Sequence, residues 1–277
     1  MKPSEFLTIE HRTQKLFQHE FSSKVKRLPK IKIEPITGDS TTECYQVDER
    51  KCYIQSKEDV FSFTSFSTYG WFRGKKTGDP ICDQIIVKYY PNCAICIMAD
   101  GCGWGEKSLK AATKATEGCL NCINRSIHLC ETIKDLGSLL VIACQQAHLN
   151  IIQHERNIMK VGTTTLNITC IVKTEKGYYL LVINIGDCRT FHYSKNEHHT
   201  LPVCGKFHHT IASMQDSQGR IGAAHSYDPE LKKPQLKLIK VEEDDIVIVA
   251  TDGFHENFNP SFVGIDNIKS FERKLIK

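Results

Sequence analysis

The sequence predicts an α+β domain in which helices cover mainly antiparallel sheets. The predicted elements run as strands, then two long helices, then strands again, which differs from the strand-helix alternation of a parallel sheet. Residues 165–172 alternate apolar and polar side chains, as a half-buried strand does. Two apolar runs, 93–99 and 246–251, each end in an Asp-Gly pair. These observations favour layered sheets with carboxylates at a sheet edge.

Length and composition set the domain organisation. The chain has 277 residues and 40% hydrophobic residues, enough to build a real core. Residues 1–55 are mixed and polar, and we interpret them as an N-terminal extension that is basic and partly flexible. Residues 56–277 are expected to form the main domain, with its C-terminal part incomplete.

The composition also excludes several classes of protein. The net charge of +4 is spread over many residues and the basic runs are short, so we expect no nucleic-acid partner. The N-terminus has no signal-peptide core and no apolar run is long enough to span a membrane, so we expect no membrane partner and a cytoplasmic location, with the nucleus as the alternative. The 13 cysteines are odd in number and many lie within apolar patterns, which favours reduced thiols over disulfides or zinc.

The first half of the chain holds the predicted helices. An amphipathic helix is expected within residues 5–21, and an early strand near residues 61–72. Two strands follow at 84–90 and 93–99, joined by a Pro-Asn turn. Apolar residues then recur at helical spacing through 106–127 and again through 133–154, which predicts two long helices.

The second half is predicted to be rich in strands. Residues 165–172 and 178–185 form an expected hairpin, and a short strand follows at 190–193. Residues 195–230 are rich in histidine, glycine and polar residues, and we expect a long surface excursion there. A last hairpin is expected from 236–241 and 246–251.

The two Asp-Gly pairs are the best clue to function. Asp100-Gly101 and Asp252-Gly253 place a carboxylate at the end of an apolar strand, beside a backbone that is free to bend. Two such edges can meet around a hard divalent cation, which prefers oxygen ligands. Asp-Gly is also the commonest turn pair, and for either copy alone that interpretation is favoured. Two copies in similar settings favour a shared metal site.

Four segments, in this order, resemble the metal-dependent serine/threonine protein phosphatases of the 2C (PPM) type. Each segment is a weak signal by itself. The ordered set, with two helices between the first and the second, is more specific and covers roughly residues 60–260. The segments are Met98–Gly105 (MADGCGWG), Gly162–Thr164 (GTT), Asn184–Arg189 (NIGDCR) and Asp244–Gly253 (DDIVIVATDG).

The resemblance implies an αββα sandwich, two antiparallel sheets flanked by helices, with a site for two Mg²⁺ or Mn²⁺ ions at one end. Asp100 then corresponds to the ligand that bridges both metals, and Gly101 to the residue that offers a backbone carbonyl. Asp252 corresponds to the later aspartate ligand, and Asp187 to a weaker third-metal site. Asp83, which opens the strand before Asp100, is the best match for the early acidic ligand.

The same resemblance implies hydrolysis of phosphoserine and phosphothreonine in proteins. Two cations lower the pKa of a bridging water and offset charge on the phosphoryl oxygens, so no protein nucleophile is needed. Arg73 is the expected phosphate-binding arginine, although an exposed loop cation is at least as good an interpretation. Asp79 competes with Asp83 for the early ligand and is interpreted as a turn residue.

Several positions depart from the family pattern. Cys102 stands where the family often has a histidine, and Cys82 stands where an acid commonly precedes the early aspartate. The Asp266-Asn267 pair lies too close to Asp252 to match the family's last ligand. A second hypothesis therefore remains open: a phosphatase-like module without activity that binds a protein partner. In both cases we expect a monomer whose partner is a phosphoprotein substrate or another protein.

Overall fold

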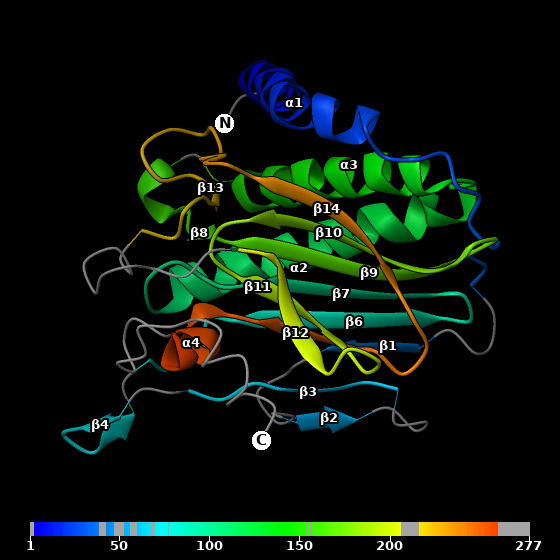
Figure 1. Ribbon diagram of the computed structural model, residues 1–277. Helices are drawn as coiled ribbons and strands as arrows, with labels where there is room; N and C mark the ends of the chain where they lie inside the picture. Colours follow the sequence, from blue (N-terminus) through cyan, green and yellow to red (C-terminus); the bar gives the residue numbers. More distant parts are fainter. Residues whose placement is uncertain are drawn as a thin grey trace.

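Two antiparallel sheets pack face to face, and helices cover the outer face of the larger one (Figure 1). The computed structural model describes residues 3–38, 43–46, 53–55, 60–67, 70–76, 78–153, 155, 157–205 and 216–259. The Asp266-Asn267 pair lies outside these residues, and so does the C-terminal part of the main domain that is expected to be incomplete.

The larger sheet has six strands in the order β1-β6-β7-β9-β10-β14. Each neighbouring pair is antiparallel. The central strand β10 carries a long apolar run because both of its faces are covered. The prediction of a half-buried strand at 165–172 is wrong, because the polar face of β9 is buried too, where Asn167 and Thr169 hydrogen-bond to Asn184 and Thr190. The strands are β1 (Glu43–Gln46), β6 (Gln84–Tyr90), β7 (Cys93–Ala99), β9 (Leu166–Thr174), β10 (Gly177–Ile185) and β14 (Gln235–Val241).

The smaller sheet has three strands in the order β12-β11-β15. They are β11 (Arg189–Ser194), β12 (His199–Cys204) and β15 (Ile246–Ala250). The expectation of a surface excursion is wrong for His199–Cys204, which pair with β11. Pro202 hides this strand from sequence patterns, and it is tolerated because β12 is an edge strand of this sheet.

Three short antiparallel pairs complete the described strands. The pair β8 (Thr163–Thr164) and β13 (Ile221–Gly222) lies beside the helices, while two ribbons formed by residues before β6 lie outside the two sheets (Figure 1). The ribbons are β2 (Tyr53–Gln55) with β3 (Ser62–Thr64), and β4 (Trp71–Phe72) with β5 (Lys75–Lys76).

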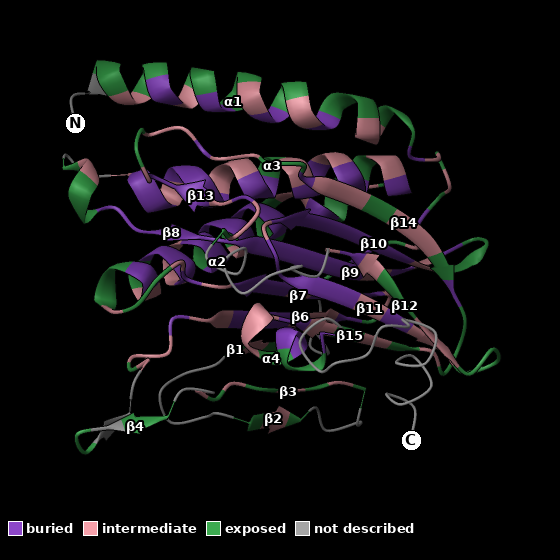
Figure 2. Cartoon of the chain, turned by 60° about the vertical axis from the view of Figure 1, so that its left-hand side comes forward, coloured by how far each residue is buried: buried purple, intermediate pink, exposed green. Residues whose placement is uncertain are grey.

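The helices pack as two layers against the six-stranded sheet. Helices α2 (Glu106–Ser126) and α3 (Ile133–Ile152) lie on the sheet, and α1 (Pro3–Lys26) packs on α3 (Figure 2). The first turn of α3 is fixed by a capping box, in which the side chain of Thr132 accepts from the backbone of Asp135 and the carboxylate of Asp135 accepts in return. All three helices lie where the sequence predicts them, and α1 extends beyond the predicted end.

Apolar side chains fill both spaces between the layers. The larger cluster joins the helices to the sheet and includes Phe17 and Phe21 of α1, which are almost fully buried. Smaller clusters lie between the sheets, such as Val87 and Met98 with Cys188, and Leu180 and Val182 with Cys204. Figure 2 shows the buried residues concentrated in β7, β9 and β10.

The predicted α+β class, antiparallel sheets with flanking helices, is confirmed. In the described residues, the helix that follows β15 is the short α4 (Asp252–His255). None of the described helices combines the length and the apolar character needed to cross a membrane. The division of the chain at residues 55 and 56 stays a prediction.

A buried histidine joins α3 to the β13 segment. The Nδ1 atom of His148 accepts the N–H of Gly222 at 3.0 Å, so its Nε2 carries the proton and donates to the carbonyl of Tyr227 at 3.1 Å. Burial lowers the pKa of His148 to about 4. The imidazole is therefore neutral at physiological pH, and protonation of Nδ1 would break the bond to Gly222.

We expect His148 to make the folded state sensitive to mild acid. Its folded pKa of about 4 lies below the ordinary value of about 6.5, so the unfolded chain binds the extra proton first. The contribution of neutral His148 to the free energy of unfolding is complete above the ordinary pKa of about 6.5. It is lost as the pH falls toward the folded pKa of about 4, and the loss reaches about 3 kcal/mol. Urea unfolding at several pH values, on wild type and His148→Gln, measures it.

Glutamine can keep both hydrogen bonds but cannot titrate, so the variant should lose less stability than wild type over this pH range. His128→Gln, at an exposed histidine, is the matched control. Equal acid sensitivity of wild type and His148→Gln would contradict the assignment.

Candidate functional site

The backbone of Asp100 is held by the segment that precedes β9. The carbonyl oxygen of Asp100 accepts the N–H of Thr165 at 2.9 Å and the hydroxyl of Thr164 at 2.7 Å. Its own N–H donates to Oγ1 of Thr165 at 3.1 Å. Three bonds thus fix the residue at the end of β7, and they explain why a Thr-rich segment stands opposite it.

Gly101 fits where no larger residue can. A Cβ atom there would lie 2.7 Å from the carbonyl oxygen of Ser108 and 2.8 Å from Cβ of Cys82. The next residue, Cys102, donates its N–H to the carbonyl of Thr163 at 2.9 Å. The Asp-Gly turn is therefore clamped between the first turn of α2 and the Thr163–Thr165 segment.

A hydrogen bond between the two sheets brings the other two aspartates to Asp100. Asp83 precedes β6, whose first residue pairs with the last residue of β7, so Asp83 lies beside Asp100. The hydroxyl of Thr251, at the end of β15, donates to Oδ2 of Asp83 at 2.9 Å. Asp252 follows directly as the first residue of α4. The end of the smaller sheet is thereby tied to the end of the larger one.

The carboxylates repel one another in this buried setting. Burial raises the pKa of Asp100 well above its usual range, and the charges of Asp83, Asp252 and Asp187 raise it further. Burial also raises the pKa of Asp83, against the hydrogen bond from Thr251, and the charge of Asp252 adds to the rise. Asp83 and Asp100 share a side-chain hydrogen bond. A divalent cation would relieve this repulsion, which is the electrostatic condition for a metal site.

A buried polar network lies behind Asp187. The carbonyl of Asp187 accepts from Nε2 of His255 at 2.9 Å, and Nδ1 of His255 lies 3.7 Å from the carboxylate of Glu256. Arg189 is also buried, and burial lowers its pKa to about 10 while the charge of Glu256 opposes the fall. The arginine of the Gly-Asp-Cys-Arg segment thus remains charged at neutral pH and links β11 electrostatically to the residues after Asp252.

Two cysteines, Cys82 and Cys102, lie within two residues of Asp83 and Asp100 in the sequence. Burial raises the pKa of the Cys82 thiol, which donates to the carbonyls of Pro80 at 3.4 Å and Gly105 at 3.6 Å. Burial likewise raises the pKa of the Cys102 thiol, against hydrogen bonds from the side chains of Thr163 and Ser217. Both thiols are therefore neutral at physiological pH and add no negative charge beside Asp83 and Asp100.

A positively charged side chain, Arg220, lies near the site, and the sequence patterns do not predict it. Arg220 precedes β13 and lowers the pKa of Cys102 through its charge, so it lies within electrostatic range of that residue. Its guanidinium donates to Glu230 at 3.0 Å. Gly219, just before it, approaches Gly186, because a Cβ on Gly219 would lie 3.4 Å from the nitrogen of Gly186. Only the tertiary fold brings this loop to Cys102 and Asp187.

The predicted phosphate-binding arginine has a different setting. Arg73 is exposed in the turn between β4 and β5, at a φ of 49°. This ribbon projects from the body of the molecule in both views (Figures 1 and 2). Asp79 is exposed in the loop that precedes Asp83. The roles of Arg73 and Asp79 stay predictions.

The side chains near Asp100 are of the types that bind a hard cation, but they are not positioned as a complete metal site. Carboxylate oxygens are the ligands that Mg²⁺ and Mn²⁺ prefer, and Asp83, Asp100, Asp252 and Asp187 all interact through their charges. Within the described ranges, however, no group of three or more His, Cys, Asp or Glu side chains is arranged so as to hold a metal ion. The predicted carboxylates therefore lie near one another, but they do not form a complete set of metal ligands.

The fold and the carboxylate cluster define an α+β protein with an acidic site where two antiparallel sheets end. The family model for protein phosphatase 2C matches residues 74–274, so the chain belongs to the protein phosphatase 2C family. The chain is also 28% identical over 197 residues to the PP2C-like domain-containing protein CG9801 of Drosophila melanogaster. That match covers 66% of this chain and 26% of the relative, so the chain spans about a quarter of the relative's length.

Solved structures give similarities of lower identity. A serine/threonine phosphatase of S. agalactiae is 16% identical, with 72% of this chain and 86% of that chain covered and a TM-score of 0.49. The Mycobacterium tuberculosis serine/threonine phosphatase PstP/Ppp is 14% identical, with 85% and 90% covered and a TM-score of 0.41.

The predicted family is confirmed, and the roles of the individual site residues stay predictions. Sequence patterns missed Thr251, Thr165 and His255, which hold the aspartates in place. A signal was present for two of them, because Thr251 directly precedes Asp252 and Thr165 directly follows the recognised Gly-Thr-Thr segment.

We expect Gly101→Ala to destabilise the fold by about 1–3 kcal/mol, because the new methyl group meets a backbone oxygen that cannot move without shifting α2. Urea unfolding measures the change. Gly70→Ala is the matched control, since a Cβ at Gly70 meets nothing within 4 Å. The close-contact assignment fails if both variants are equally stable.

We expect Mn²⁺ to stabilise the wild type and not Asp100→Asn. At about 100 times its dissociation constant, a ligand of the folded state adds about 3 kcal/mol of stability. In EDTA the variant should unfold at the same temperature as wild type or higher, because one buried like charge has been removed. Thermal unfolding with and without Mn²⁺ measures both effects. Asp79→Asn, an exposed neighbour, should behave like wild type; an equal Mn²⁺ response in Asp100→Asn would rule out the site.

Proposed function

We propose that this protein is a metal-dependent phosphatase that hydrolyses phosphoserine and phosphothreonine in proteins. The observation that supports it most is that Asp83, Asp100 and Asp252 lie near one another at three strand ends, where their charges repel. Membership of the protein phosphatase 2C family supports the reaction class.

Each residue has a distinct task in this proposal. Asp83, Asp100 and Asp252 would hold the two ions with their carboxylates, and Gly101 would add its carbonyl oxygen. Asp187 would serve a weaker third position. Bound Mg²⁺ or Mn²⁺ supplies a water of lowered pKa and neutralises charge on the phosphoryl oxygens. Thr251 and Thr165 are positioning residues, because they fix Asp83 and the backbone of Asp100 respectively.

A second candidate is a phosphatase-like module that binds a protein partner without turnover. Two observations favour it. In the part of the chain that the structure describes, no three ligands are arranged to hold a metal ion. The two thiols at Cys82 and Cys102 are neutral where the family pattern has an acid and a histidine, so the site has less charge to bind cations and one proton carrier fewer.

Hydrolysis of para-nitrophenyl phosphate and of a phosphothreonine peptide separates the two candidates. With Mn²⁺ we expect turnover in wild type and a loss of at least about 100-fold in Asp100→Asn and Asp252→Asn, since each removes several kcal/mol of charge stabilisation. Asp79→Asn should keep wild-type activity. Absence of turnover in a wild type that still folds would reject the enzyme and leave the binding module.

A further inference from the structure

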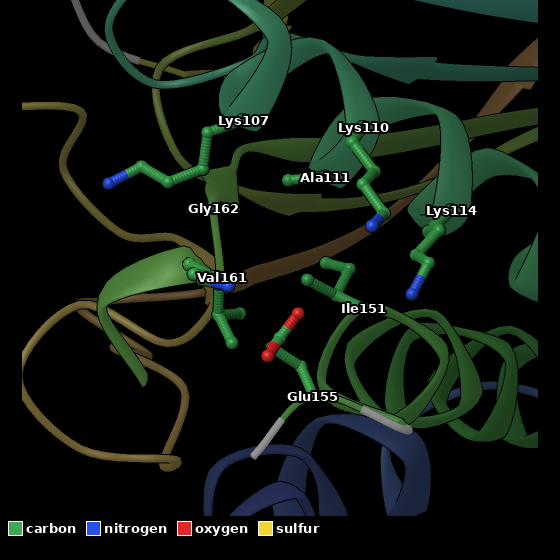
Figure 3. Close-up of a pocket in the computed structure, with 9 residues that line it drawn as sticks. Lys107, Lys110, Ala111, Lys114, Ile151, Glu155, Val161 and Gly162 are labelled. Atoms are coloured by element: carbon green, nitrogen blue, oxygen red, sulfur yellow. The ribbon is translucent and has the colours of Figure 1, made fainter. Parts of the chain in front are cut away.

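A depression on the helical side of the molecule is lined by lysines. It lies between the first half of α2, the end of α3 and the residues just before β8, and it is a shallow hollow, open to solvent, whose cavity volume is about 10 Å³ (Figure 3). We call it the lysine pocket. Its lining consists of Lys107, Lys110, Ala111, Lys114, Ile151, Glu155, Lys160, Val161 and Gly162.

The charges in the pocket are unbalanced. Four of the lining residues are lysines and one, Glu155, is acidic. Lys110 and Lys114 lie one turn apart on α2, where like charges repel each other. In Figure 3 the ammonium groups of these two lysines extend to the space that faces Ile151 and Glu155, while Lys107 extends in another direction. Partial burial lowers the pKa of Lys114, and the charge of Lys110 lowers it further.

Glu155 makes hydrogen bonds to residues other than the lysines. Its Oε1 accepts the N–H of Asn157 at 3.2 Å, and its carbonyl accepts the hydroxyl of Tyr227 at 3.4 Å. The carboxylate is thereby held by the chain that turns out of α3. One anchored carboxylate faces two ammonium groups, and four lysines line the pocket in all, so the pocket keeps a net positive charge.

One side of the pocket is closed by a tight packing contact. Gly162 packs against α2 so closely that a Cβ atom would lie 2.1 Å from the carbonyl oxygen of Lys107. Ala111 and Val161 also line the pocket. Lys107, Lys110 and Lys160 are exposed and Lys114 is half-buried, and all four border the hollow between two helices and a loop.

We propose that the lysine pocket binds an oxyanion of the phosphate class, held chiefly by Lys110 and Lys114. A phosphate group carries close to two negative charges at neutral pH and several acceptor oxygens, which match two or more ammonium donors. The pocket is separate from the carboxylate site and independent of the proposed hydrolysis.

The place of the pocket connects it to that site. Gly162 precedes Thr163, whose carbonyl accepts the N–H of Cys102 at 2.9 Å. The lysine pocket therefore borders the segment that binds the backbone next to Gly101, and three of its four lysines lie on α2.

Nuclear magnetic resonance of the ¹⁵N-labelled protein tests the proposal. Inorganic phosphate is titrated in EDTA at constant ionic strength, so that no cation recruits it to the carboxylates. We expect saturable shifts of the amides of Ala111, Val161 and Gly162. Lys110→Gln with Lys114→Gln should weaken binding by about tenfold or more, because charged hydrogen bonds are lost. Lys15→Gln with Lys176→Gln, two exposed lysines elsewhere, removes the same charge and should change nothing.

Glu155→Gln provides a variant with the opposite expected effect. Glutamine keeps the acceptor for Asn157 but removes the competing charge, so phosphate should bind a few times more tightly. It also tests the proposal if the double lysine variant fails to fold. Absence of saturable shifts, an equal loss in the control pair, or no gain in Glu155→Gln would overturn the site.

Two further titrations distinguish the source of the anion. Tighter binding of a phosphoserine peptide than of inorganic phosphate would assign the pocket to a phosphorylated segment, and the reverse order would assign it to free phosphate. Both results support a phosphate-class site. Acetate that saturates the same amides as strongly as phosphate would overturn it.

Discussion

The close contact between the Asp100-Gly101 turn and the Thr163–Thr165 segment is the constraint on which the site depends. The turn gains three hydrogen bonds from this segment and has no space for a side chain at Gly101. Because β7 and β9 are neighbours in the same sheet, the sheet register determines where the Asp100 backbone lies. The remaining groups of the site are placed relative to this fixed point.

The second determinant is the burial of like charges. Thr251 brings the end of the smaller sheet to Asp83, and Asp252 follows into the same region. Burial in low dielectric strengthens the repulsion among the aspartates, and the neutral thiols of Cys82 and Cys102 add no charge to it. The site therefore combines carboxylates that repel one another with neighbouring thiols that carry no charge.

Helix α2 connects the two charged regions of the molecule. Its first turn lies against Gly101, and its next turns carry the lysines that border the pocket. His148 of α3 binds the backbone of Gly222, which pairs with Thr163. The acidic site and the lysine pocket are therefore built on the same few backbone segments.

The sequence by itself determined the fold class, the main helices and most strands, because hydrophobic periodicity and turn residues act locally. It also identified Asp100 and Asp252 at strand ends, where an Asp-Gly pair follows an apolar run. It did not identify strand β12, since Pro202 is acceptable only at a sheet edge and the edge is a property of the assembled sheet. Nor did it identify Thr251 as the partner of Asp83, Arg220 near Cys102, or the lysine pocket, because these groups are distant along the chain. Only tertiary packing decided which charged groups lie close together, and electrostatic energy depends on the distance between the charges.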